Sequence, residues 1–189
     1  MQFTPGAMQH GDPLGQHLST PIDLHDLGAP PELQGGLEAV RIDIALHRER
    51  ASHSLFVGAP GNGQALAAAS LGKAVGMPVF RIDLSAVMSR YIGETEKNVD
   101  RLFDQAVRAN SILFFDEADA LFGRRTDVHD AHDRYGNDDV AYLLRKLEAY
   151  AGPAILATSS RPDIHPATLR RLTYVLDFRT PLPPPKPIA

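Results

Sequence analysis

Short apolar runs alternate with segments of helical periodicity along this chain, and that alternation restricts its fold more than any other feature. The runs that we expect to form strands are residues 55–57, 78–83, 112–115, 154–157 and 174–178. Between them, apolar residues recur at helical spacing within 33–44, 64–75, 99–106 and 140–147. Strands that alternate with helices predict an α/β domain, in which a mostly parallel, five-stranded sheet is flanked by helices.

The chain has the length of one domain with a tail at each end. Of its 189 residues, 1–21 are rich in Gly, Pro, Gln and His and lack periodicity, which predicts a flexible N-terminal tail. Residues 181–189 hold five prolines, which fix φ and lack a backbone donor, so an extended proline-rich tail is expected there. The folded domain is then predicted to span residues 22–180.

Composition excludes several classes of function. The net charge of −4 gives no basic footprint for nucleic acid, and the absence of cysteine excludes disulfides, thiolate nucleophiles and cysteine metal sites. No apolar run approaches the roughly 18 residues that a membrane span needs, and the N-terminus lacks the pattern of a signal peptide. We therefore expect a cytoplasmic protein with neither a nucleic acid nor a membrane as its partner.

A glycine-rich loop follows the first apolar run and precedes a helical segment, as a phosphate-binding loop does. Glycines at 58, 61 and 63 would let backbone N–H groups turn inward, and the following helix N-terminus attracts anions. The predicted nucleotide-binding residues are Gly58, Pro60, Gly61, Asn62, Gly63, Gln64 and Ala65. However, the usual pattern ends in lysine and then serine or threonine, whereas Gln64 is neutral and Ala65 carries no oxygen. A glycine-rich turn without any ligand is the alternative.

An acidic pair ends the apolar run 112–115, as in the Walker B motif. Asp116 would hold Mg²⁺, and Glu117 would polarise the attacking water as a general base. The alternative is a pair of carboxylates that only caps the segment 118–122. Because the glycine-rich loop and the acidic pair occur in order, roughly 50 residues apart with strand–helix units between them, the two motifs together favour a site for ATP and Mg²⁺.

Residues 52–178 resemble the large α/β subdomain of an AAA+ ATPase. The matching stretches are 58–63, 91–98, 102–106, 112–123, 156–158 and 161–163. The stretch 131–135 is also similar to AAA+ ATPases encoded with phage-tail-like contractile injection systems. The resemblance implies a three-layer P-loop NTPase fold, with ATP and Mg²⁺ as cofactors and a ring oligomer as the assembly. It also implies a small helical lid after the last strand, which we expect to be absent here.

The family also implies roles for single residues. Asp116 matches its Mg²⁺-binding carboxylate and Glu117 its water-activating one. Tyr91 matches the aromatic residue of the pore loop that contacts a polypeptide client. Ser159 falls where a catalytic polar residue, usually asparagine, senses the nucleotide. Thr173 falls where an arginine finger commonly serves the neighbouring subunit.

Four departures from the family pattern bear on activity: Gln64, Ala65, Ser159 and Thr173. One lost charge-assisted phosphate contact weakens binding by roughly 10–100-fold, and a lost arginine finger slows hydrolysis by about 10³–10⁵. We therefore expect weak or no ATP binding and little hydrolysis, and a docking or regulatory subunit that joins an AAA+ homologue in a protein-remodelling assembly. The alternative is a working ATPase module that remodels protein partners. With both hypotheses in play, the sequence does not decide whether the chain is an enzyme.

Overall fold

The computed structural model of the chain describes residues 14–47, 51–88, 94–122, 131–159 and 172–184. These residues form a six-stranded sheet in the order β1-β3-β4-β5-β2-β6. Five of the strands are parallel: β2 (His53–Val57), β3 (Val79–Ile82), β4 (Ile112–Phe115), β5 (Ala154–Thr158) and β6 (Leu172–Asp177). The predicted α/β class with a mostly parallel sheet is confirmed.

The central strands are covered on both faces, which explains their apolar sequences. Every residue of β2, β4 and β5 is buried. Along β4 the side chains alternate: Leu113 and Phe115 belong to one core cluster, and Ile112 and Phe114 belong to the other. Such alternation is the period-two geometry of a strand that lies between two helical layers.

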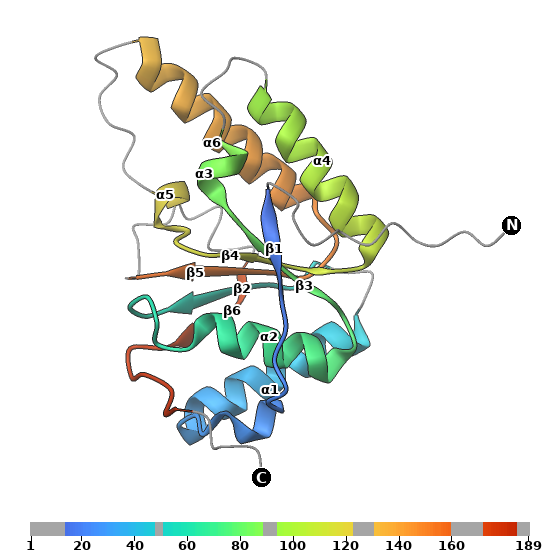
Figure 1. The fold of residues 1–189 in the computed structure, drawn as a ribbon, viewed down its shortest axis with the longest axis vertical. Coiled ribbons are helices and arrows are strands. Elements are labelled where there is room, and N and C mark those ends of the chain that lie inside the picture. Colours follow the sequence, from blue (N-terminus) through green and yellow to red (C-terminus); the bar gives the residue numbers. More distant parts are fainter. Residues whose placement is uncertain (1–13, 48–50, 89–93, 123–130, 160–171, 185–189) are drawn as a thin grey trace, which may run out of the picture.

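Helices cover the two faces of the sheet, so the domain has three layers (Figure 1). One face carries α1 (Pro31–Leu46) and α2 (Gln64–Val75), and the other carries α4 (Glu94–Ala109) and α6 (Ala131–Ala149). The remaining helical segments are short: η1 (Leu24–Leu27), a 3₁₀ turn, α3 (Leu84–Val87) and α5 (Asp119–Phe122). None of the described helices is both long and apolar enough to cross a membrane.

The N-terminal stretch predicted to be a flexible tail holds a strand. β1 (Gly15–Leu18) pairs antiparallel with β3 and makes the sheet six-stranded instead of five-stranded. Leu14 is buried in the core beside it and accepts a hydrogen bond from the backbone N–H of Asp83 at 3.0 Å. One apolar anchor and a row of backbone hydrogen bonds therefore hold a segment whose polar composition suggested no structure. Residues 1–13 lie outside the described part of the chain.

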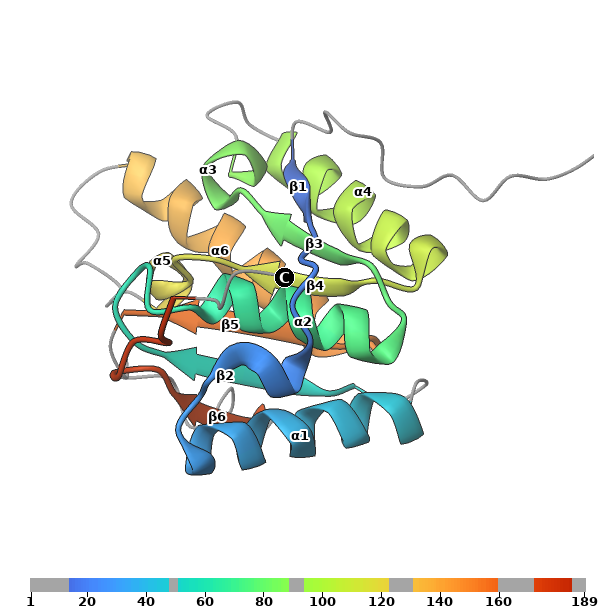
Figure 2. The same ribbon diagram turned by 60° about the horizontal axis from the view of Figure 1, so that its bottom comes forward.

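The chain leaves β6 as an extended segment that packs back on the domain. We call residues 178–184 the strap; its described prolines form no helix, as the sequence predicted. The strap runs beside the loop that joins β2 to α2 (Figure 2). Its Leu182 N–H donates to the Asn62 carbonyl at 2.9 Å. The beginning of the predicted proline-rich tail is therefore a packed segment, and residues 185–189 lie outside the described part.

Candidate functional site

The glycine-rich loop, residues 58–63, joins the carboxyl end of β2 to the first residue of α2. Gly61 has a φ of 88° and Gly63 a φ of 106°, in the left-handed region that favours glycine. At Gly58 a Cβ atom would lie 2.3 Å from the Phe178 carbonyl oxygen, so no larger residue fits there. Sequence and fold agree that this loop has the backbone of a phosphate cradle.

Gln64, at the position of the usual lysine, points back at the loop. Its side chain is only 5% exposed, and its Nε2 donates to the Gly58 carbonyl at 2.7 Å and to the Ala59 carbonyl at 3.3 Å. Lys73, the basic residue of α2, could supply the missing charge instead. It lies in the last turn of that helix and pairs with Asp23 at 2.8 Å. Neither side chain therefore offers a positive charge to the loop.

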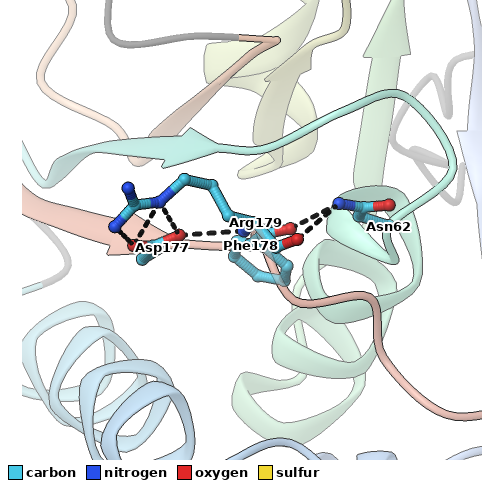
Figure 3. Close-up of polar contacts among 4 residues, drawn as sticks. All are labelled: Asn62, Asp177, Phe178 and Arg179. Atoms are coloured by element: carbon cyan, nitrogen blue, oxygen red, sulfur yellow. Dashed lines mark hydrogen bonds and ion pairs between the residues drawn. The ribbon is translucent and has the colours of Figure 1, made fainter.

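Asn62 faces the strap (Figure 3). Its Nδ2 donates to the Phe178 carbonyl at 2.7 Å and to the Arg179 carbonyl at 3.4 Å. Arg179 in turn pairs with Asp177, and its hydrogen bonds lower the pKa of that carboxyl from 3.8 to about 2. The Asn62 side chain thus ties the outer side of the loop to the strap, whereas we predicted it to contact a nucleotide.

The acidic end of β4 is held by several polar contacts. Asp116 is half-buried, and its Oδ2 lies 2.6 Å from Arg81 Nη2. Its Oδ1 accepts the backbone N–H of Glu117 at 3.1 Å. Glu117 is exposed and has a φ of 52°, a left-handed conformation that costs of order 1–3 kcal/mol in a residue other than glycine. Such strain is often found at functional sites. The predicted role of Glu117 as a general base stays a prediction.

Ser159, directly after β5, is tied to Asp119 at the start of α5. Both the backbone N–H and the Oγ of Ser159 donate to the Asp119 carboxylate, with nearest distances of 2.9 Å each. The serine hydroxyl is therefore engaged by a carboxylate, and a water molecule or a phosphate would have to compete for it. Asp119 was not among the predicted site residues, although it stands in the motif that follows the acidic pair.

The fold gathers these residues around one open hollow of about 190 Å³. It is lined by Gly58, Pro60, Gln64, Asp116, Glu117, Asp119, Ala157, Thr158 and Ser159. Six of these were predicted as site residues, whereas Gly61, Asn62, Gly63 and Ala65 do not line it. Most of that volume is open to solvent, and its enclosed part, about 10 Å³, has room for roughly one water molecule. Among the described residues that line it, all of the charged ones carry carboxylates.

The residues around the hollow do not fit a Mg²⁺ site of the usual kind. Ala65 has no side-chain oxygen, and the Asp116 carboxylate is already paired with Arg81. Within the described ranges, no three acidic or histidine side chains are grouped so that they could hold a metal ion. The backbone of the loop fits phosphate, but the side chains supply neither its metal nor its lysine.

Thr173 lies far from the glycine-rich loop of its own chain. It stands near the beginning of β6, at the irregularity between the pairs His53–Leu172 and Ser54–Tyr174, while the loop follows the end of β2. The four residue steps from the beginning to the end of β2 correspond to roughly 13 Å. A residue at this position could act only outside its own loop, in line with the role that the resemblance implies. Tyr91 lies outside the described residues.

Comparisons with known proteins identify relatives over the same region. The profile of the family described as "ATPase family associated with various cellular activities (AAA)" matches residues 54–180. The chain is 35% identical over 132 residues to "Uncharacterized AAA family ATPase y4kL" of Sinorhizobium fredii, a match that covers 69% of this chain and 39% of that protein. It is 33% identical over 134 residues to the proteasome-activating nucleotidase of Pyrococcus abyssi, covering 68% and 34%.

A solved structure has the same fold. The crystal structure of the FIGL-1 AAA domain in complex with ADP matches with a TM-score of 0.64 at 21% identity, covering 87% of this chain and 57% of that one. The match thus spans less than two thirds of each of these three relatives. Because the family profile covers residues 54–180, well over half of the sequence, this chain belongs to the AAA family of ATPases.

Proposed function

We propose that this chain is a degenerate AAA domain that binds ATP weakly or not at all and turns it over little. The observation that carries the proposal is the state of Gln64. Its neutral amide is buried and hydrogen-bonded to two carbonyls of the glycine-rich loop, where the usual pattern has a lysine for phosphate. A phosphate ligand would gain no charge from this side chain and would have to displace its hydrogen bonds.

The charges around Gln64 and the residue at position 173 weaken the expected binding and hydrolysis of ATP further. Among the described residues, the charged groups that line the hollow are Asp116, Glu117 and Asp119, and Arg81 offsets only the first of these negative charges. A charge-assisted contact to phosphate is worth roughly 1.5–3 kcal/mol, and its loss weakens binding by about 10–100-fold. Thr173 supplies no guanidinium to a neighbour, and the loss of an arginine finger costs about 10³–10⁵ in rate. The loss of the finger alone would leave little turnover.

A domain of this kind would act through its surfaces. We propose a docking or regulatory role in a protein-remodelling assembly, in which this chain associates with an intact AAA homologue, in a ring or part of one. Tyr91 is the residue proposed to contact a polypeptide client. Similarity of the stretch 131–135 to ATPases of contractile injection systems suggests where such an assembly would operate, and a cytoplasmic location remains part of the proposal.

Two measurements on the purified chain test the proposal. Calorimetry with ATP and ADP, with and without Mg²⁺, should give no binding or binding weaker than micromolar. Steady-state phosphate release should stay at background, and Glu117→Gln should leave that background unchanged, because no intrinsic hydrolysis depends on this carboxylate. Micromolar or tighter ATP binding, or release that the Glu117→Gln change abolishes, would refute the proposal.

The second candidate is a working ATPase module. One observation favours it: the fold brings Gly58, Asp116, Glu117 and Ser159 to one hollow, as an active site requires. Hydrolysis would then have to use the backbone cradle and Glu117 without the usual lysine. Release that appears only after an intact homologue is added, and that Glu117→Gln in this chain removes, would favour the second candidate.

A further inference from the structure

A positive charge already lies against the acidic end of β4. Arg81 Nη2 is 2.6 Å from Asp116 Oδ2, and this ion pair is only partly exposed, with 39% of the arginine side chain and 27% of the aspartate side chain accessible. The other oxygen of Asp116 accepts the Glu117 N–H. Both oxygens of the expected metal ligand are therefore engaged by groups of this chain.

The register of the sheet brings the two side chains together. Arg81 in β3 is paired with Phe114 in β4, and Asp116 stands two residues beyond Phe114. Val79 and Phe114 both belong to the core cluster that includes the buried face of α2. Because side chains two residues apart share a face, Arg81 and Asp116 lie on the side of the sheet where α2 begins.

On that same side, the second protein ligand expected for Mg²⁺ is missing. Ala65, in the first turn of α2, has no side-chain oxygen. Mg²⁺ binds oxygen ligands at close range and in strict geometry. A guanidinium within hydrogen-bond distance of the remaining carboxylate competes for the oxygen and cancels part of the charge that would attract the ion.

We infer that Arg81 takes the place of Mg²⁺ beside Asp116, so that any phosphate group that this chain binds, however weakly, is bound without a metal ion. The inference deepens the proposed function and rests on it only for the identity of the ligand. Asp116 is then the partner of Arg81 instead of a metal ligand. Arg81 is the residue that makes binding independent of metal, and removal of its charge should expose a metal-binding carboxylate.

The direct test uses Mn²⁺ alone, because free Mn²⁺ can be counted by electron paramagnetic resonance. Wild type should bind Mn²⁺ no better than Asp116→Asn. Arg81→Leu should gain affinity by roughly 1.5- to 5-fold, the scale of one partly exposed ion pair, and Arg81→Leu/Asp116→Asn should lose the gain. The matched control is Arg41→Leu, which removes a pair with Glu38 of similar exposure, 31% and 30%, on α1. It should gain nothing.

Two results would overturn the inference. One is that wild type binds Mn²⁺ and that Asp116→Asn lowers this affinity severalfold. The other is that Arg81→Leu folds but binds Mn²⁺ no more tightly than wild type. If circular dichroism shows that Arg81→Leu does not fold, Arg81→Gln, which keeps most of the stem and a polar end, gives the same comparison. The Mn²⁺ result stands whether or not the chain binds nucleotide. Brisk ATP hydrolysis would refute the proposed function while the titration still decided the role of Arg81.

Discussion

Gln64→Lys should raise the affinity for ATP and ADP, because position 64 is where the loop lacks its charge. In the free protein, the new ammonium group can donate to the Gly58 and Ala59 carbonyls that Gln64 now contacts, so the loop should keep its shape. With a ligand bound, the group exchanges these neutral partners for phosphate oxygens. That exchange is worth roughly 1.5–3 kcal/mol, and 1.4 kcal/mol corresponds to a factor of ten. We expect a gain of about 10–100-fold.

A second change separates charge from metal. Ala65→Thr adds the missing hydroxyl, but Asp116 keeps its contact with Arg81. The double variant Gln64→Lys/Ala65→Thr should therefore bind ATP with an affinity that depends only slightly more on Mg²⁺ than that of Gln64→Lys. Phosphate release by the double variant should stay near background. A positioned phosphate still lacks the guanidinium of a neighbour, because Thr173 stands in its place.

Calorimetry with ATP and ADP, in Mg²⁺ and in EDTA, measures the gain, and a phosphate-release assay measures turnover. Gln34→Lys is a suitable control, because Gln34 Nε2 also donates to a backbone carbonyl, that of Leu24, and Gln34 belongs to α1 and does not line the hollow. If Gln64→Lys binds ATP no better than wild type, charge is not what the loop lacks. If the double variant alone releases phosphate at about 1 per second, a typical enzyme rate, a neighbour's arginine is not needed.

Three further outcomes follow from single contacts. Asn62→Asp keeps the size of the side chain but removes its donor to the strap, and should lower the free energy of unfolding by about 1–2 kcal/mol in urea titrations. Tyr150→Phe removes the buried hydroxyl that donates to the Ser111 carbonyl at 2.9 Å, and should cost about 1 kcal/mol in the same titration. The pKa of Asp177 is lowered from 3.8 to about 2 by Arg179, so their pairing stabilises the fold above pH 4 and is lost as the pH falls toward 2. Arg179→Ala should therefore melt below wild type at pH 6, with a difference that disappears near pH 2.

The sequence predicted the elements whose side chains carry a periodic signal. The predicted helix 64–75 and the predicted strand 112–115 have the observed bounds of α2 and β4. α4 and α6 begin earlier than their apolar stripes, since the sequence of their first turns is mostly polar and carries no apolar periodicity. β1 was missed because an edge strand is held by backbone hydrogen bonds to β3, which leave no pattern in its side chains.

At the site, the sequence identified residues that belong to contiguous motifs and missed those that the topology adds. Glu117 and Ser159 were predicted from motifs and resemblance, and both line the hollow. Arg81 was missed, because its proximity to Asp116 depends on the pairing of two strands that lie more than 30 residues apart in the chain. The available signal was a single arginine within an otherwise apolar strand. Asp119 was missed because its partner, Ser159, follows a different strand, β5.

Protein contacts on both sides of the glycine-rich loop account for its shape without any ligand. Gln64 fixes the inner side through the Gly58 and Ala59 carbonyls, and Asn62 fixes the outer side through the strap. Glycine at 63 is required by its φ of 106° and by Leu182, whose Cδ1 would lie 2.6 Å from a Cβ there. A phosphate loop held in this way keeps its conformation when nothing binds. We therefore expect its preserved backbone to be no measure of nucleotide affinity, and the charge at position 64 to determine that affinity.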